Sequence, residues 1–364
     1  MDSEYSLCNV SQYYLHHQSC GLRSAATGWW RTEPELLVRG SVQGFGLEEV
    51  AMLFVTFHGG KPGKHPHRNN VHAFDKDGKL LSHAILEDRG ELILDELRGI
   101  HRHGKYLYVV VANKTHNSVL CYEGSETSHR FVSKFASQET TDGILHPFDL
   151  TFDDAGGYCY LSSQDTNVVT RLKLTEEGRV GKPAPLPAAL EGRGKFSAGT
   201  FIASSRSSLS PTAKTPVAAP AGLEYSDEGA KKHSVRGILW TNGALYVADQ
   251  PAGRIKVYDR EGRYLGQSNQ VETPVHLVVA GNKLLVSGAN EILQAELTRD
   301  AGNLRLTAVP GLHVKNGGGM ALSSSGNLYI ASRTENKIFK FGPDFKPLPF
   351  ASDLPDNPEF LLHV

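Results

Sequence analysis

Short apolar runs recur along the chain, each followed by a turn rich in Gly, Asn or Asp. The clearest copy opens at 235–238 (Val-Arg-Gly-Ile), continues at 244–247 (Ala-Leu-Tyr-Val) and ends at 254–259 (Arg-Ile-Lys-Val-Tyr-Asp). Apolar runs of this length bounded by turn residues predict β-strands. The same order of strand, turn, strand, polar tip and strand returns elsewhere, so the pattern is an internal repeat.

Five copies of the repeat open at 97, 147, 235, 274 and 318. A sixth is visible only in part, because 52–55 leads to 70–75 without an opening strand. The last residues, 358–364 (Pro-Glu-Phe-Leu-Leu-His-Val), match the opening strand of the other copies. We therefore expect the two ends of the repeat region to complete one unit between them.

Six small sheets closed by pairing of the N- and C-terminal segments predict an all-β fold, a six-bladed β-propeller. Ring closure leaves few sheet edges exposed, and most copies lie about 40 to 50 residues apart, which is a normal blade size. The second and third copies open 88 residues apart, and the excess falls at 175–233. A Ser-, Ala-, Pro- and Thr-rich stretch at 196–221 predicts a long loop there, either a lid or a passive insertion. We expect 1–47 to form an N-terminal arm and 48–364 the propeller.

Composition excludes several classes of function. The 364 residues carry 38 Lys and Arg against 39 Asp and Glu, for a net charge of −1. This balance gives no electrostatic basis for binding nucleic acid or an anionic membrane. No apolar run is long enough to span a bilayer and the N-terminus lacks a signal-peptide pattern, so we expect a cytoplasmic protein. Four scattered cysteines do not form a disulfide framework, and Cys121 and Cys159, in strand-like runs, are expected to be buried thiols.

Polar residues at the starts of the innermost strands are the candidates for chemistry. On this level, which we expect to line the central tunnel of the propeller, we place Arg98, His101, His146, Asp149, Arg236, His276 and Glu359. On the nearby strand tips we place His58, Asn113, His116, Gln164, Asp165, Asn167, Asp249, Gln250 and Arg333. Such groups are costly to bury without partners or a function. For Arg98 and Arg236, structural ion pairing and ligand binding both remain open at this point.

These residue types predict chemistry on a small oxygenated molecule. Arginine holds oxygen atoms in a two-pronged contact, and histidine transfers protons near neutral pH. The predicted catalytic residues are Arg98, His101, His146, Arg236 and His276; the predicted substrate-binding residues are Asn113, Phe148, Asp149, Gln164, Trp240 and Glu359. No nucleophile or phosphate-loop motif is present, and no cofactor or metal is expected. His65 and His67 flank a proline in a basic loop, which favours a solvated hairpin tip over a metal site.

The copy at 245–259, Leu-Tyr-Val-Ala-Asp followed by Arg-Ile-Lys-Val-Tyr-Asp, resembles the NHL and SMP-30/gluconolactonase-like propellers. The resemblance covers roughly 48–364 and implies a six-bladed propeller, which in the SMP-30-like enzymes holds a divalent ion through an Asn or Asp before Gly. In this sequence those positions carry Arg98 and Arg236, with Phe148, Val275 and Gly318 at the others. Arginine cannot ligate a cation, so the sequence departs from a calcium-dependent lactonase.

Three functions follow from these observations. The first is a metal-independent lyase or cyclase, because the chain also resembles propeller proteins of fungal secondary metabolism, the hetero-Diels–Alderases of tropolone-sesquiterpenoid pathways. That resemblance implies dehydration to a quinone methide and cycloaddition to a terpene. The second is a metal-dependent SMP-30-like hydrolase using Glu359 with Asp149 or Asp249. The third is a non-catalytic NHL-type interaction propeller. The first predicts a small-molecule partner and leaves the oligomeric state open.

Overall fold

The computed structural model describes residues 51–58, 69–90, 92, 94–113, 115–141, 143–186, 199–202, 234–298, 300, 302–350 and 354–364. The chain divides into two compact units, Met1–Glu48 and Glu49–Val364. The predicted N-terminal arm, the loop with His65 and His67, and much of 175–233 lie outside the described residues. No described helix is long and apolar enough to cross a membrane.

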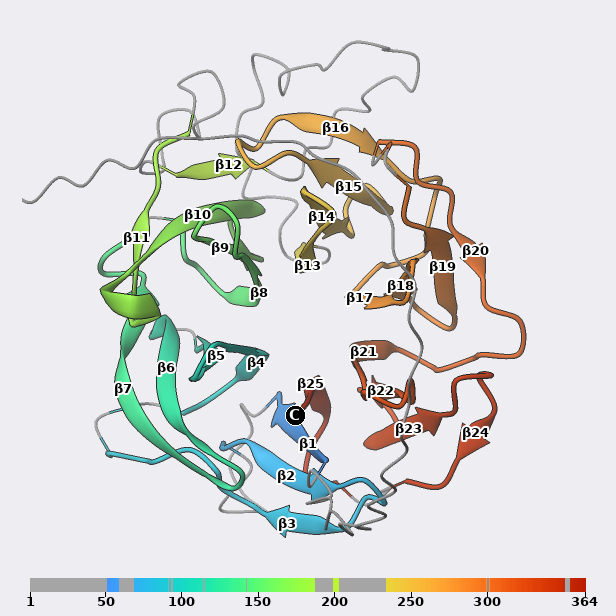
Figure 1. Cartoon of the computed structure of the whole chain (residues 1–364), viewed down its shortest axis with the longest axis horizontal. Coiled ribbons are helices and arrows are strands. Elements are labelled where there is room, and N and C mark those ends of the chain that lie inside the picture. Colours follow the sequence, from blue (N-terminus) through green and yellow to red (C-terminus); the bar gives the residue numbers. More distant parts are fainter. Residues whose placement is uncertain are drawn as a thin grey trace, which may run out of the picture. The chain divides into compact units, whose positions relative to one another are not determined.

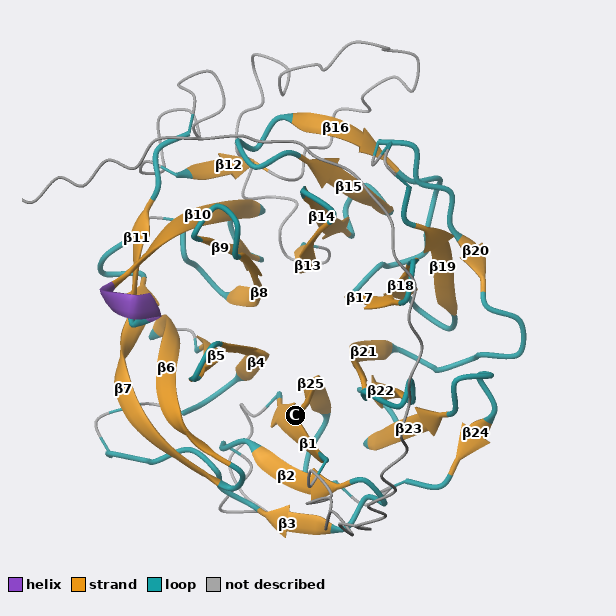
Figure 2. Cartoon of the chain, viewed as in Figure 1, coloured by secondary structure: helices purple, strands orange, loops and turns teal. Residues whose placement is uncertain are grey.

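The second unit is a ring of six antiparallel sheets, which confirms the predicted six-bladed propeller (Figure 1). Within the described residues, helix is confined to one 3₁₀ turn at Glu176–Gly178 (Figure 2). Blade 1 consists, from the inside outwards, of β25 (Pro358–His363), β1 (Met52–Phe57), β2 (His72–Asp75) and β3 (Leu80–Ser82). Blade 2 consists of β4 (Leu97–His103), β5 (Tyr106–Ala112), β6 (Asn117–Ser125) and β7 (Ser128–Ser137). Blade 3 consists of β8 (Pro147–Asp153), β9 (Tyr158–Ser163), β10 (Val168–Thr175), β11 (Val180–Pro183) and β12 (Thr200–Ile202).

The other three blades follow the same plan. Blade 4 consists of β13 (Val235–Thr241), β14 (Ala244–Asp249), β15 (Arg254–Tyr258) and β16 (Tyr264–Gln267). Blade 5 consists of β17 (Leu277–Ala280), β18 (Lys283–Ser287), β19 (Ile292–Glu296) and β20 (Thr307–Ala308). Blade 6 consists of β21 (Gly317–Leu322), β22 (Leu328–Ser332), β23 (Lys337–Phe341) and β24 (Pro347–Leu348). The innermost strands β25, β4, β8, β13, β17 and β21 succeed one another around the ring.

The ring closes through the two ends of the second unit, as predicted. Strand β25 pairs antiparallel with β1, with Phe54 opposite Leu362, and the backbones of Met52 and Val364 exchange two hydrogen bonds of 3.0 and 2.9 Å. Closure of this kind ties sequence-distant segments into one sheet and removes two open edges.

The predicted insertion at 175–233 contributes strands to blade 3, and β12 falls inside the stretch 196–221 that was expected to be loop. Strand β11 continues the sheet of blade 3 as a hairpin with β10, and β12 pairs with the other half of β10. The long β10 therefore has two separate outer partners. Residues 187–198 and 203–233 lie outside the described residues.

The repeated Leu-Tyr-Val strands explain the packing between blades. The tyrosines of four second strands, Tyr108, Tyr160, Tyr246 and Tyr329, are almost fully buried. Two of their hydroxyls find backbone acceptors: Tyr108 donates to Gly178 at 2.7 Å and Tyr160 to Arg260 at 3.0 Å. A buried tyrosine needs such a partner for its polar end.

Cys121 and Cys159 are buried free thiols, as predicted. Burial raises the pKa of Cys121 to about 12, and it raises that of Cys159 as well. Both side chains therefore act as part of the apolar packing.

Candidate functional site

A β-bulge near the start of the innermost strand places the candidate residues. In five blades, two consecutive residues of this strand oppose a single residue of the second strand. The bulge pairs are Arg98–Gly99, Phe148–Asp149, Arg236–Gly237, Gly318–Gly319 and Glu359–Phe360. In blade 5 the corresponding pair, Val275–His276, directly precedes β17. Bulges redirect side chains. Here the first and the second bulge residues of the blades form two separate levels of the ring.

The second bulge position alternates between glycine and a larger residue around the ring. The order is Gly99, Asp149, Gly237, His276, Gly319 and Phe360. A Cβ on Gly237 would lie 2.6 Å from the carbonyl oxygen of Val275, and one on Gly319 would lie 2.6 Å from the Cα of Phe360. Each of these glycines thus leaves room for the backbone of the next blade to approach.

The first bulge position carries a buried ion-pair cluster. Glu359 is 1% exposed, and Arg333 donates to its Oε1 from Nε at 2.9 Å and lies 2.8 Å away through Nη2. Arg98 is 2% exposed and reaches the same oxygen from Nη1 at 3.9 Å. Burial raises the pKa of Glu359, but the positive charges of Arg333 and Arg98 outweigh it, so its pKa lies below the ordinary value.

Arg333 takes the place of a missing side chain. Gly318 holds the first bulge position of blade 6, and a Cβ there would lie 3.2 Å from Cγ of Arg333. Arg98 and Arg236 hold the first bulge position of blades 2 and 4. Three arginines therefore stand on alternate blades around the mouth of the ring.

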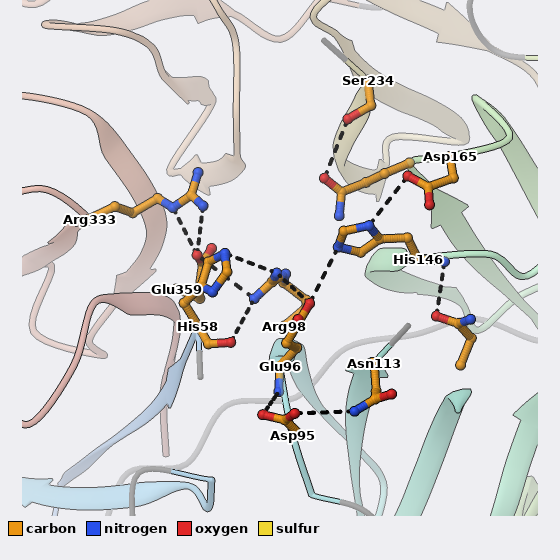
Figure 3. A network of polar contacts seen from close by, with 12 residues as sticks. His58, Asp95, Glu96, Arg98, Asn113, His146, Asp165, Ser234, Arg333 and Glu359 are labelled. Atoms are coloured by element: carbon orange, nitrogen blue, oxygen red, sulfur yellow. Dashed lines mark hydrogen bonds and ion pairs between the residues drawn. The ribbon is translucent and has the colours of Figure 1, made fainter. Parts of the chain in front are cut away.

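The cluster continues through Glu96 and His146 to Asp165 (Figure 3). Oε2 of Glu96 lies 3.5 Å from Nη2 of Arg98 and 3.8 Å from Nε2 of His146, and Nδ1 of His146 lies 3.3 Å from Asp165. Glu96 and His146 each precede an innermost strand and have positive φ values of 50° and 51°. Non-glycine residues adopt this conformation at a cost, and it is frequent at functional sites.

His58 lies beside Arg98 in the same cluster. Nη2 of Arg98 lies 3.4 Å from Nε2 of His58, and Nη1 donates to its backbone carbonyl at 3.5 Å. The charge of His58 also contributes to lowering the pKa of Glu359.

Arg236 differs from the other two arginines because its partners are amides. Its Nε donates to Gln250 Oε1 at 2.9 Å, its Nη1 donates to Gln164 Oε1, and its guanidinium lies 5.1 Å from the ring centre of Phe148. No carboxylate of the described residues pairs with it. Burial lowers the pKa of Arg236 to about 10, helped by the charge of Arg333, so it remains a cation at neutral pH.

Several buried polar atoms at this level have no hydrogen-bond partner within the described part of the chain. They are Nε of Arg98, Nε2 of Gln164 and Nε2 of His146. Arg98 and Gln164 are only 2% and 3% exposed. Unpartnered buried donors are rare in native proteins and call for an explanation. Together with Arg236, which has no described carboxylate within ion-pair distance, they mark this level as a place where a ligand oxygen would complete the contacts.

The second bulge position carries a separate polar set. Asp149 is fully buried, and Nε2 of His101 lies 3.1 Å from its Oδ1. The backbone nitrogens of Leu150 and Ile238 donate to its two oxygens at 2.9 and 3.0 Å. Nε2 of His276 lies 3.7 Å from Oδ2, which is an electrostatic contact and not a hydrogen bond.

The predicted site residues thus fall into two groups and some outliers. The residues at the first bulge level, together with His58, Glu96 and Arg333, are called the mouth cluster below. The predicted residues in it are Arg98, His146, Gln164, Arg236 and Glu359, and those in the second set are His101, Asp149 and His276. Phe148 is 1% exposed and packs between Arg236 and Phe360. Asn113 donates to Asp95, beside Glu96, at 3.2 Å.

Trp240 belongs to neither of these two groups. It stacks on Tyr160 with ring centres 5.3 Å apart, and Arg260 covers it at 5.6 Å. The side chain therefore packs between blades 3 and 4, and its predicted contact with substrate stays a prediction.

Three members of the mouth cluster were given no role from sequence. Arg333 and His58 were placed only on strand tips, and Glu96 was not considered. Glu96 could have been found by aligning the repeats, because it stands before blade 2 as His146 stands before blade 3.

Metal ligation has little support in the described residues. No group of three or more His, Cys, Asp or Glu within them is placed to hold an ion. Both carboxylates nearest the mouth, Glu96 and Glu359, face arginines instead.

Comparisons with known proteins extend the fold and little else. No protein-family model matches the sequence, and no curated protein matches it. Among solved structures, the chain is similar to one in a nidogen/laminin complex (TM-score 0.52, 12% identity, 86% of this chain and 98% of that one). It is also similar to a protein from Lactobacillus plantarum (TM-score 0.52, 14% identity, 84% of this chain and 82% of that one). A functionally unknown protein from Desulfotomaculum acetoxidans is similar too (TM-score 0.53, 13% identity, 86% of this chain and 98% of that one). At such low identity these likenesses show the fold alone.

Proposed function

We propose that this propeller is a lyase or cyclase that takes a small, oxygen-rich organic molecule at the mouth cluster. The observation that carries the proposal is Arg236, a cation held in place by two amide oxygens with no carboxylate partner among the described residues. A guanidinium fixed in this way is prepared to bind a ligand oxyanion. Arg98 and Arg333 stand on the alternate blades and add to the positive potential.

The neighbourhood of Arg236 favours a flat ligand. Its guanidinium covers the Phe148 ring, so a planar anion would find a cation and an aromatic edge side by side. Enolic and tropolone-like molecules combine planarity with an acidic hydroxyl. They match this lining better than a hydrated divalent ion, which requires several free oxygen ligands.

The proposed reaction is a dehydration. A histidine accepts the proton of the acidic hydroxyl, and the O–H electron pair becomes part of a carbonyl. The conjugated electrons shift, the bond from carbon to a neighbouring hydroxyl breaks, and a returned proton makes the leaving hydroxide water. The product is a quinone methide, which can add an alkene in a cycloaddition that needs no further proton. The arginines would stabilise the developing oxyanion.

Binding of tropolone and of benzoate to the full-length protein tests the proposal by calorimetry at low salt. We expect Arg236→Gln to weaken tropolone binding by about tenfold to a hundredfold, since a charge-assisted hydrogen bond contributes about 1.5–3 kcal/mol. Arg254→Gln is the matched control, because Arg254 lies in the same blade and, among the described residues, donates to the carbonyl of Ser268 at 2.7 Å and not to a side chain of the mouth. Equal affinities of Arg236→Gln and wild type would contradict the proposal.

Elemental analysis and thermal unfolding with EDTA or added calcium address the alternative, a metal-dependent hydrolase. Stoichiometric calcium, together with a loss of stability in EDTA, would favour the hydrolase and overturn the proposal.

A further inference from the structure

The contacts around Asp149 indicate different roles for the two histidines beside it, His276 and His101. Nδ1 of His276 accepts a hydrogen bond from the backbone nitrogen of Met320 at 3.1 Å. The ring proton is therefore on Nε2, which faces Asp149. Burial lowers the pKa of His276 to about 4, so this histidine is neutral, with Nδ1 bonded to the backbone of Met320 and Nε2–H facing Asp149. It holds blade 5 to blade 6 and has no lone pair left for a substrate.

His101 has the opposite arrangement. Its Nε2 lies 3.1 Å from Oδ1 of Asp149, whose oxygens otherwise receive only donors. Nε2 is therefore the protonated nitrogen, and Nδ1 carries the lone pair. The side chain is 28% exposed. A buried carboxylate that fixes one ring nitrogen while leaving the other open is the arrangement by which proteins orient an imidazole base.

His103 provides an internal comparison two residues along the same strand. It also is 28% exposed and lies 3.2 Å from a carboxylate, that of Asp154. Asp154, however, is 81% exposed, whereas Asp149 is 0% exposed. An exposed carboxylate is mobile and screened and holds its partner weakly. Of His101 and His103, only His101 is thus held in one tautomer by a buried carboxylate.

We propose that His101 is the proton-accepting base of this tunnel and that Asp149 is the residue that positions it, for a ligand with an acidic hydroxyl. The identity of the ligand rests on the proposed function; the state of His101 does not. Asp149 and Phe148 form one bulge, and Arg236 covers Phe148, so the base and the oxyanion site are attached to the same two residues.

The proton transfer is balanced within the pair. Nδ1 of His101 forms a bond to the hydroxyl proton, the O–H bond breaks, and its electron pair stays on the ligand oxygen. The positive charge on the imidazole then faces the buried Asp149 carboxylate. The same proton can return to a leaving hydroxide.

The first experiment needs no ligand. Nitrogen-15 NMR of histidine-labelled full-length protein, assigned with His101→Gln, should show His101 as the Nε2–H tautomer with an unprotonated Nδ1. Asp149→Asn should abolish this preference and leave the signals of His103 in place. Diethyl pyrocarbonate should modify His101 and leave His276 unmodified. An Nδ1–H tautomer for His101 would overturn the proposal whatever the ligand proves to be.

The second experiment uses 4-nitrophenol, whose phenolate absorbs visible light. At a pH where the free phenol is mostly neutral, we expect the molecule to ionise on binding to the wild type and to His103→Gln. The ionised fraction at saturation should fall at least threefold in His101→Gln. An unchanged fraction would overturn the assignment of the base. Arg236→Gln should instead raise the dissociation constant, so that failure of the oxyanion site and failure of the base give different results.

Discussion

The two levels of the ring differ in how completely their polar groups are paired. On the first level three arginines meet two buried or nearly buried carboxylates, and donors on Arg98 and Gln164 lack partners within the described residues. On the second level, among the described residues, each of the groups around Asp149 has a contact except Nδ1 of His101. The first level therefore leaves several groups for a ligand, whereas the second leaves a single nitrogen.

The difference has a structural cause in the bulge. Its first residue faces the mouth, where neighbouring blades leave room for long side chains. Its second residue contacts the next blade: Asp149 accepts from Ile238, and His276 accepts from Met320 at the equivalent position. Ligand binding and ring assembly are thus assigned to adjacent residues of one strand.

Loss of the Glu359 charge should have the largest effect of any single change at the mouth. Glu359→Gln leaves Arg333 and Arg98 facing each other without their shared, 1%-exposed carboxylate. We expect a loss of about 3–5 kcal/mol in the free energy of unfolding, because removing one member of a buried ion pair strands the other. Urea unfolding monitored by fluorescence measures it.

Asp165→Asn is the control for that change. Asp165 also carries charge at the mouth but is 58% exposed beside His146, so its removal should change stability by less than about 1 kcal/mol. A similar loss in both variants would show that the mouth does not depend on buried pairing.

Lowering the pH should remove the stability that depends on the buried, neutral histidines before it removes the stability that depends on the Glu359 charge. Burial lowers the pKa of both His276 and His129 to about 4, while their unfolded pKa is about 6.5. The unfolded chain therefore binds protons that the folded chain does not, and stability falls as the pH drops from 6.5 to 4, by roughly 3 kcal/mol for each histidine. The low pKa of Glu359 adds to this loss only below its unfolded value of about 4.5.

The variant His129→Phe distinguishes the contribution of His129 to this pH dependence from that of His276. His129 packs edge-on against Phe54 in the core and has no hydrogen-bond partner on either ring nitrogen in the described structure. Its replacement should halve the dependence of unfolding free energy on pH between 6.5 and 4.5, and the remainder belongs to His276. An unchanged slope in urea titrations at several pH values would contradict this assignment.

The alternation of glycines predicts a graded response to added methyl groups. A Cβ would lie 2.6 Å from backbone atoms at Gly237 and Gly319 but 3.0 Å from Asp149 at Gly99. We expect Gly237→Ala and Gly319→Ala to cost about 1–3 kcal/mol through overpacking, and Gly99→Ala to cost less. Thermal unfolding of the three variants checks the order, and equal costs would mean that blade spacing does not depend on these contacts.

The repeat and its closure could be predicted because they rest on local patterns. The opening strands, the Leu-Tyr-Val strands and the matching segment at 358–364 are visible as strings of residues, and the predicted ring is confirmed. The equivalence of Arg98, Arg236 and Glu359 was also visible, because each follows the first residue of a repeat. What could not be predicted is which equivalent residues meet.

The missed contacts depend on geometry that one sequence does not show. Arg333 reaches Glu359 because Gly318 leaves space for it, and Trp240 stacks on Tyr160 of the neighbouring blade. The bulge separates Asp149 from the mouth, although Phe148, the preceding residue, contacts Arg236.

Substitutions of the hydroxyl side chains that stand opposite the bulges should have the smallest measurable effect on the free energy of unfolding. Thr56, Ser162 and Ser287 stand opposite the bulges whose second residue is large, whereas Val110, Ala248 and Ala331 stand opposite those with glycine. Ser287 accepts from the backbone nitrogen of His276 at 3.0 Å and donates to the carbonyl of Gly318 at 2.8 Å.

Ser287→Ala therefore removes a link between blades 5 and 6 and should cost about 1–2 kcal/mol, since buried backbone groups lose a partner. Ala248→Ser, the reverse change in blade 4, should give no gain, because the backbone nitrogen of Gly237 already donates to Val275 at 2.7 Å. Urea unfolding of both variants compares the two kinds of blade directly. A stabilising Ala248→Ser would show instead that the hydroxyl is interchangeable between the two kinds of blade.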